Sequence, residues 1–330
     1  MSILQAMVLG LVQGLSEFLP ISSSGHLILA RAIMGIADQA EAPVLQILDI
    51  LLHVGTLIAV LVVFWKDWMD ILRYLVKSKA IFVLFIVSIA ASALTLVFRD
   101  YLKSVNLNDV CYYVCGALFA TTILLLMIKS RTLLLLFIAS IPALIVAYLF
   151  NDALEGLFSG WFVGFAFLIT GTIMLLAEKL SKRGGRHVKR TEEPGYKHAI
   201  SMGCMQAVAL LPGVSRSGST LLGGVASGLT RQSAAKFAFM MSAPAILGSL
   251  LIKGKSALEN GYFQQLDLVP VVIGMVAAAI SGYLAIRFML KLINRISLSW
   301  FALYVGLVGV AVIIIQLAAP TFLPLPAFFG

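Results

Sequence analysis

The sequence predicts an all-α, polytopic helical membrane protein: an inverted-topology repeat with two re-entrant helix hairpins and about eight spanning helices. The 330 residues are 61% hydrophobic and only 12% charged, so there are too few charges to cover a soluble domain of this size. Most apolar runs are long enough to cross about 30 Å of hydrocarbon as helices. The alternating pattern of an outer-membrane barrel is absent from the sequence.

Two polar stretches with a common pattern interrupt the apolar runs, at 10–26 and 203–220. In each, Gly is followed three residues later by Gln, then by Leu-Pro, and then by a Ser-x-Ser-Gly loop. Aligning the two loops places Ser23 opposite Arg216. A duplicated polar hairpin in an apolar chain suggests one site built from two halves.

The candidate spans are the uninterrupted apolar runs 45–65, 80–98, 110–128, 132–150, 161–177, 231–252, 268–288 and 298–317. Segments 2–36 and 198–230 differ, because Pro and a Ser/Gly cluster break each of them into two short arms. Broken backbone at membrane depth is tolerated only where it is buried in protein or faces a water-filled cavity. We therefore expect both segments to be re-entrant hairpins with their tips inside the membrane.

The whole chain, 1–330, is interpreted as a single integral membrane domain. Its predicted parts are a first repeat (1–79 plus 132–177), an inserted helical hairpin (80–128), a basic loop (178–197) and a second repeat (198–317).

Basic loops predict the orientation, because Lys and Arg accumulate on the cytoplasmic side. Cytoplasmic positions are predicted for loops 178–197 and 66–79, for Lys129 with Arg131, and for Arg287, Lys291 and Arg295. The acidic loops 37–44 and 151–160 then fall outside. In this topology the first hairpin enters from outside and the second from the cytoplasm, so that their tips meet near the midplane.

The net charge of +9 follows from these loops, and it does not indicate a nucleic-acid partner. The three cysteines, Cys111, Cys115 and Cys204, lie in apolar segments and form neither a disulfide framework nor a metal-binding spacing.

Ionisable groups concentrate in the first hairpin. Gln13 and Glu17 are four residues apart and share one helix face. A carboxylate at this depth indicates a functional site, although a structural hydrogen bond between the arms is the alternative. The Ser22–Gly25 loop offers hydroxyls and backbone N–H groups at a helix start, where anions are favoured. His26 can serve as base, acid or proton carrier.

Arg216, in the second hairpin, suits bidentate recognition of phosphate. Asp49 and His53 are four apart on one span, as an outer layer of the site or simply as an intrahelical pair. Together these groups indicate phosphoryl chemistry, in which a hydroxyl attacks a phosphate held by a guanidinium.

The two motifs resemble the signatures of the bacitracin-resistance family of undecaprenyl-pyrophosphate phosphatases. The signatures are read here from Gln13 to His26 and from Pro212 to Thr220, with a lesser pattern from Asp49 to Thr56. The resemblance covers about 3–65 and 132–317, and segment 80–128 has no counterpart in the usual layout of three spans per repeat.

The resemblance implies a multi-pass enzyme of the bacterial plasma (inner) membrane, with its site open to the periplasmic or external side. It would hydrolyse the lipid undecaprenyl pyrophosphate to undecaprenyl phosphate and inorganic phosphate. This recycles the carrier lipid of peptidoglycan and cell-wall synthesis, which maintains cell shape. Bacitracin would compete by sequestering the substrate. A homodimer is left open.

The resemblance also implies roles for individual residues. Ser23 would be the nucleophile, Glu17 and His26 would be acid–base or ion-binding groups, and Arg216 would bind the pyrophosphate. The predicted substrate-binding residues are Gln13, Ser22, Ser24, Gly25, Ser215, Ser217 and Thr220. No organic cofactor is expected, and Mg²⁺ or Ca²⁺ would bridge Glu17 and the pyrophosphate.

Two questions stay open at the level of sequence. The nucleophile is Ser23, His26 or water. The alternative function is a lipid-phosphate carrier or flippase that uses Arg216 only to bind the head group, because inverted repeats with broken helices are also transporter architecture.

Overall fold

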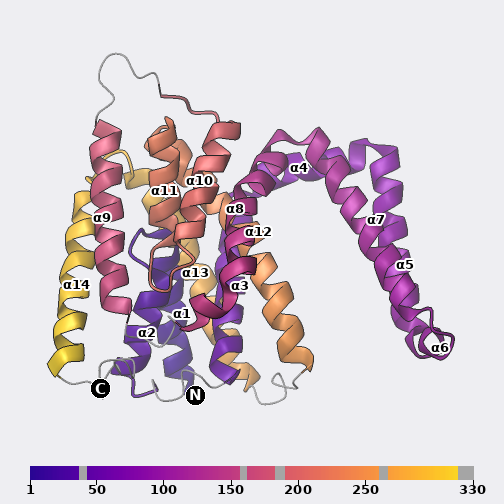
Figure 1. Cartoon of the computed structure of the whole chain (residues 1–330), viewed down its shortest axis with the longest axis horizontal. Helices are drawn as coiled ribbons and strands as arrows, with labels where there is room; N and C mark the ends of the chain where they lie inside the picture. The colour runs from indigo at the N-terminus through magenta and orange to yellow at the C-terminus, as the bar shows by residue number, and fades with distance from the viewer. Residues whose placement is uncertain (37–42, 157–161, 183–189, 260–266, 319–330) are drawn as a thin grey trace. The chain divides into compact units, whose positions relative to one another are not determined.

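The computed structural model describes residues 1–36, 43–156, 162–182, 190–259 and 267–318 (Figure 1). All named elements in these ranges are helices. Seven of them are long and apolar enough to cross a membrane, or eight when α3 and α4 are counted as one broken span. This confirms the prediction of an all-α, polytopic membrane protein.

The helices are α1 (Ile3–Phe18), α2 (Ser23–Ile33), α3 (Pro43–Val63), α4 (Trp65–Lys77), α5 (Lys79–Val97), α6 (Arg99–Ser104), α7 (Asn108–Lys129), α8 (Arg131–Gly156), α9 (Val163–Lys182), α10 (Tyr196–Val208), α11 (Arg216–Ser227), α12 (Arg231–Glu259), α13 (Leu268–Leu292) and α14 (Ser299–Ala318). They form two compact units, one of residues 1–63 with 136–330 and the other of residues 64–135.

The first unit contains both polar hairpins. α1 with α2 and α10 with α11 form two helix pairs that point toward each other from opposite ends of this unit (Figure 1). α13 packs against α1 and α3, α14 packs against α9, and α11 packs against both α9 and α12. The long helices therefore enclose the two hairpins.

The same N-cap begins the second arm of each hairpin. The Ser22 hydroxyl accepts the N–H of Gly25 at 3.2 Å, and the Ser215 hydroxyl accepts the N–H of Gly218 at 3.1 Å. Serine is among the best N-caps, because its oxygen satisfies a backbone donor that the helix leaves unpaired. The Ser-x-Ser-Gly repeat thus specifies two equivalent helix starts.

Close helix packing fixes the first arm of the first hairpin. A Cβ at Gly10 would collide with the backbone oxygen of Gly274 in α13, and one at Gly14 would collide with Ser281. Small residues let helix backbones approach closely, which is the main source of helix association in lipid. A larger side chain at either position would displace α1 and the polar groups that it carries.

The apolar core of this unit lies on both sides of the first hairpin. One cluster joins α1, α2, α3 and α13 and includes Leu9, Leu27 and Leu52. A second cluster joins α2, α9 and α14 and includes Phe167 and Val305. The second arm, α2, is held between the two clusters.

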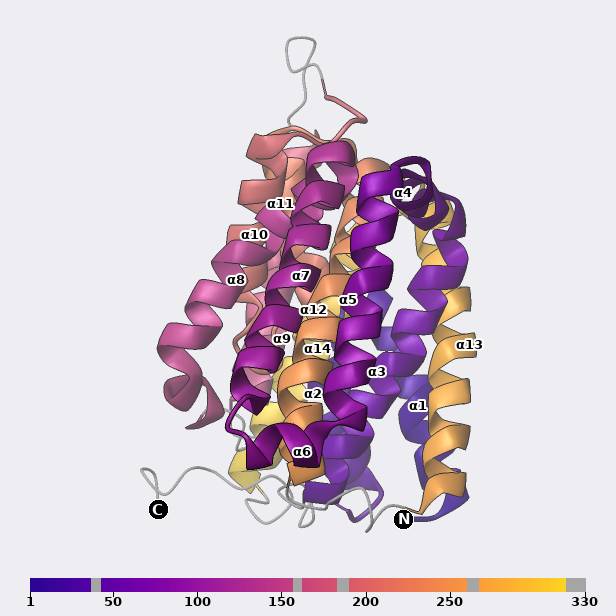
Figure 2. The same ribbon diagram turned by 90° about the vertical axis from the view of Figure 1, so that its right-hand side faces the viewer.

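The second unit contains an antiparallel helix pair, α5 and α7, that lies side by side and is connected through α6 (Figures 1 and 2). The predicted loop 66–79 is wrong, because residues 65–77 form the helix α4. Apolar Ile71 and Leu75 recur at helical spacing and are buried. In the sequence this periodicity is hidden by the mixed charges, which lower the average hydropathy of the segment.

Other predicted loops also change. The prediction for 151–160 is wrong over its first part, because α8 continues to Gly156 past non-helical backbone at Phe150. In the predicted loop 178–197, α9 extends to Lys182 and α10 begins at Tyr196. Residues 37–42 of the acidic loop 37–44, and residues 183–189, lie outside the described residues. The repeat boundaries stay a prediction.

Candidate functional site

The tips of the two hairpins contact each other directly. Gly213 donates its N–H to the hydroxyl of Ser24 at 3.2 Å, and Ser217 donates its hydroxyl to the carbonyl of Leu19 at 3.0 Å. Gly213 has φ +81°, a left-handed conformation that glycine adopts without steric cost. These contacts bring the first turns of α2 and α11 together.

Glu17 is the centre of the polar groups at the tips. Its side chain is only 5% exposed and forms an ion pair with Arg216 through Oε1. Its other oxygen, Oε2, accepts hydrogen bonds from the Ser23 hydroxyl at 2.6 Å and from Gln13 Nε2 at 3.1 Å. A buried carboxylate is stable only when it is paired and hydrogen-bonded, so the two hairpins satisfy one charge together.

Ser23 and Arg216 remain partly accessible around this centre. The Arg216 side chain is 24% exposed and Ser23 is half-buried. The guanidinium has five N–H donors, so it has capacity for an anionic ligand. The Ser23 proton points to Glu17, which leaves the oxygen lone pairs for attack and supplies a base within hydrogen-bond reach.

His26 makes its hydrogen bonds elsewhere. Its Nδ1 lies 2.7 Å from the carbonyl oxygen of Ser22, and its Nε2 lies 2.8 Å from the hydroxyl of Tyr304 in α14. The ring stacks on Tyr304 and meets Phe167 edge-on at 5.1 Å. Sequence reasoning missed Tyr304 and Phe167, since both are far along the chain and neither belongs to the polar motifs.

Asp49 and His53 have separate partners. The His53 Nε2 lies 3.9 Å from Oε2 of Glu17, which places this ring beside the site. The Asp49 carboxylate instead pairs with Arg31 of α2. The only bond between the two residues runs from the His53 ring to the Asp49 backbone oxygen, at 2.7 Å. His53 therefore borders the site, whereas Asp49 connects α2 to α3.

Most of the predicted substrate-binding residues support the loops. Ser22 and Ser215 are N-caps, and Thr220 donates its hydroxyl to the Arg216 carbonyl at 2.8 Å. A Cβ at Gly25 would lie 2.8 Å from the Phe167 ring, so glycine lets α2 pack closely there. Among these residues, Gln13 is the one bonded to the Glu17 carboxylate.

The donors for a metal ion are few. The described residues contain no group of three or more His, Cys, Asp or Glu side chains that could hold one. Gln13 Oε1 is buried and has no hydrogen-bond partner among them. Gln13 and Glu17 together offer oxygen ligands of the kind that Mg²⁺ and Ca²⁺ prefer, but the remaining ligands would have to come from substrate and water.

A further ion pair, largely buried and not predicted from the sequence, joins Glu178 and Arg231 away from the tips. Glu178 Oε2 accepts from Arg231 at 2.7 Å and from the N–H of Leu298 at 2.8 Å. Arg231 also bonds the carbonyl of Ile296 at 3.2 Å. This network connects α9 to α12 and to the segment before α14, and it touches none of the motif residues.

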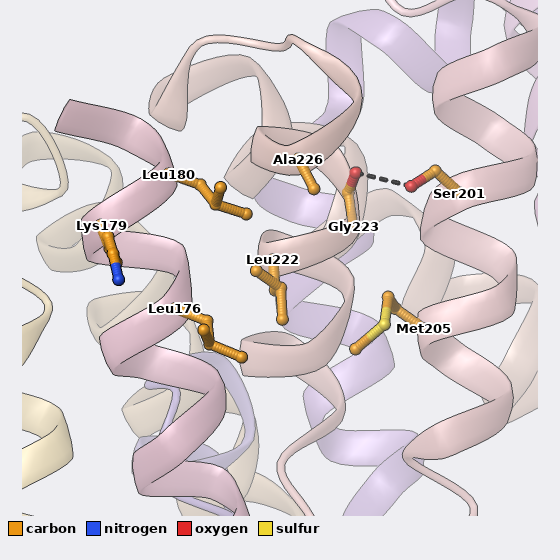
Figure 3. A pocket seen from close by; sticks show the side chains of 8 residues that line it. All are labelled: Leu176, Lys179, Leu180, Ser201, Met205, Leu222, Gly223 and Ala226. Atoms are coloured by element: carbon orange, nitrogen blue, oxygen red, sulfur yellow. Dashed lines mark hydrogen bonds between the residues drawn. The ribbon is translucent and has the colours of Figure 1, made fainter. Parts of the chain in front are cut away.

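A pocket of about 280 Å³ lies between α9, α10 and α11 (Figure 3). Its lining is mainly apolar, with Leu176 and Leu180 from α9, Met205 from α10 and Leu222 from α11. No residue of the predicted site lines it. The pocket is therefore separate from the polar centre at the hairpin tips.

The fold and the site define a class of protein: a polytopic helical membrane protein with a carboxylate, a hydroxyl and a guanidinium gathered at two opposed hairpin tips. The family model described as Bacitracin resistance protein BacA matches residues 6–133 and 127–311. The chain belongs to this family.

Several curated relatives match along nearly their whole length. An undecaprenyl-diphosphatase of Carboxydothermus hydrogenoformans is 35% identical over 320 residues, which cover 96% of this chain and 99% of the relative. One of Halothermothrix orenii is 35% identical over 317 residues, covering 96% and 98%. One of Methanobrevibacter smithii is 35% identical over 314 residues, covering 94% and 97%. The family match continues through 80–128, so it is wider than the motifs indicated.

Proposed function

We propose that this protein hydrolyses undecaprenyl pyrophosphate to undecaprenyl phosphate and inorganic phosphate. The names of its relatives support this substrate. One structural observation carries the proposal: Ser23 of one hairpin and Arg216 of the other meet at the Glu17 carboxylate. A nucleophile and a phosphate-binding cation thus both contact the carboxylate that can serve as the base.

Substrate binding would change the partner of Arg216. A pyrophosphate carries more negative charge than one carboxylate and can accept two parallel hydrogen bonds from a guanidinium. Arg216 would move toward the terminal phosphate, and Glu17 would keep its bond to Ser23. The first turns of α2 and α11, which start beside the site, add backbone N–H groups that favour an anion.

The first chemical step is then in-line attack by Ser23. Its oxygen forms a bond to the terminal phosphorus, the proton passes to Glu17 Oε2, and the bond from that phosphorus to the bridging oxygen breaks. Undecaprenyl phosphate leaves with the bonding electrons, while Arg216 stabilises the charge on the transferring group. The product of this step is a phosphoserine.

The second step releases phosphate. Water attacks the phosphoserine, the bond between phosphorus and the Ser23 oxygen breaks, and Glu17 returns its proton to that oxygen. The protons of the water leave with inorganic phosphate and the solvent. If Mg²⁺ or Ca²⁺ takes part, Glu17 and Gln13 would be the residues that hold it, and it would supply neutralisation of the phosphate charge.

The proposal includes a location. In the bacterial plasma membrane, the basic loops would favour an orientation in which the first hairpin enters from outside, so the site would open to the external face. Single cysteines introduced in 37–44 should react with an impermeant thiol reagent in intact cells, whereas those in 178–197 should not. The opposite pattern would overturn this orientation.

Recycling of the carrier lipid at that face would oppose bacitracin, which would bind the same pyrophosphate.

The activity can be tested with purified protein and undecaprenyl pyrophosphate or a shorter prenyl pyrophosphate. We expect phosphate release that is abolished by Ser23→Ala and unchanged by Ser227→Ala, a hydroxyl remote from the tips. Trapping with labelled substrate should give an acid-stable, base-labile phosphoserine. An acid-labile adduct would identify His26 as the nucleophile, and no adduct would indicate water. Movement of the lipid without phosphate release would replace the enzyme with a carrier.

A further inference from the structure

The His26 ring is held at both nitrogens and on two sides. Nδ1 lies 2.7 Å from the Ser22 carbonyl oxygen, and Nε2 lies 2.8 Å from the Tyr304 hydroxyl. The Tyr304 ring is nearly parallel to His26, with an interplanar angle of 15°, and Phe167 meets it edge-on at 84°. Ser22 itself has φ +76°, a strained conformation for a non-glycine residue and one often found at functional sites.

These bonds determine where the histidine proton lies. A carbonyl oxygen can only accept, so Nδ1 must carry the hydrogen that points to Ser22. In a neutral imidazole the other nitrogen is then an acceptor. The Tyr304 hydroxyl is therefore the donor to Nε2, and the basic lone pair of His26 is occupied by Tyr304.

Because this lone pair points to Tyr304, His26 is not the base for Ser23. Ser23 already donates to Glu17 at 2.6 Å, so the serine has its base without the histidine. His26 follows Ser23 by three residues on α2, which places the two side chains within about one turn of each other. A ring in this position can assist only if it is kept in one orientation.

We propose that Tyr304 is a positioning residue for His26. Its hydroxyl holds the Nδ1–H tautomer and the ring orientation, and its aromatic face supports the ring. Because Tyr304 occupies its Nε2, His26 does not attack the substrate itself; its Nδ1–H holds the Ser22 carbonyl, and with it the start of α2 that carries Ser23, in place for the release of phosphate. The kinetic part of this inference rests on the proposed function, whereas the structural part does not.

Kinetics of matched variants test the role. Tyr304→Phe keeps the ring and removes the hydroxyl, so we expect kcat to fall roughly tenfold with KM nearly unchanged and with more phosphoserine accumulating. Tyr148→Phe, a change at a highly exposed tyrosine of α8, should leave both constants unchanged. In the His26→Ala background, Tyr304→Phe should have no further effect, because residues that act through one another are non-additive.

Nitrogen NMR of ¹⁵N-histidine-labelled protein provides a readout independent of turnover. In the wild type, the His26 signals should show a protonated Nδ1 and a hydrogen-bonded Nε2, and Tyr304→Phe should shift the Nε2 signal. Wild-type kcat together with an unshifted signal in Tyr304→Phe would overturn the proposal, as would additive losses in the double variant. If the wild type released no phosphate, the proposed function would fail, and the NMR shift alone would decide whether Tyr304 positions His26.

Discussion

Glu17 and Arg216 form an ion pair although 199 positions of sequence separate them. Each residue belongs to a different hairpin, so the pair can exist only when both tips are in place. It gives a counter-ion to the Glu17 carboxylate, whose side chain is only 5% exposed. The same pair also holds the Arg216 guanidinium, which the proposed reaction requires, at the site.

Replacing Arg216 with Lys is expected to lower kcat/KM by about 10²- to 10³-fold although the charge is kept. An ammonium is a point charge and cannot reproduce the planar, bidentate grip of a guanidinium on a pyrophosphate. The measurement is phosphate release by purified variants. Arg73→Lys, at an exposed ion pair with Asp70, is the matched control. Near-normal turnover in Arg216→Lys would remove Arg216 from the centre of the mechanism.

Glu17→Gln should reduce kcat by about 10²- to 10⁴-fold, the usual contribution of a positioned general base. The amide is similar in shape but cannot take the Ser23 proton, and it leaves the Arg216 guanidinium without its counter-ion. Thermal unfolding should be measured alongside, because loss of the buried charge partner also destabilises the protein. A stable Glu17→Gln variant that still forms phosphoserine at the normal rate would contradict the role of Glu17 as base.

The sequence was sufficient to predict the helical class, the two hairpins and the groups that gather at Glu17. Those predictions worked because apolar length, Ser-Gly caps and ionisable residues at membrane depth have strong local causes. The partners Tyr304 and Arg31 were not predictable, since which faces of distant helices meet is decided by packing. The helix α4 was not predicted for the opposite reason. Its apolar periodicity is local, but its mixed charges are typical of a loop.

The Arg31–Asp49 pair should contribute to stability and not to chemistry. The Arg31 side chain is only 7% exposed. Asp49→Asn would leave the Arg31 guanidinium buried without a counter-ion. We expect a loss of about 1 to 3 kcal/mol, below that of a fully buried pair because Asp49 is partly exposed. The midpoint of thermal unfolding in detergent would fall, while kcat per folded molecule stays close to that of the wild type. A large fall in kcat without loss of stability would return Asp49 to the site.

The stability of the protein should also depend on the protonation of His198, which lies at the start of α10, outside the spanning helices. Burial, and then the neighbouring Lys197, lower the pKa of His198 below its ordinary value. Its Nδ1 accepts the N–H of Gly195 at 2.8 Å, a bond that only the neutral ring can accept.

The sign of the effect follows from comparing the folded and unfolded chains. In the unfolded chain His198 would bind a proton near its usual pKa of about 6.5, whereas the folded chain resists protonation. The stabilising contribution is therefore complete above that pH and is lost as the pH falls from there toward the lowered pKa. His198→Gln keeps a side-chain acceptor for the N-cap, in the manner of a capping box, but does not titrate. Between about pH 8 and pH 5, the melting temperature should fall more steeply in the wild type than in His198→Gln. Parallel curves would show that protonation of His198 does not affect the stability of the protein.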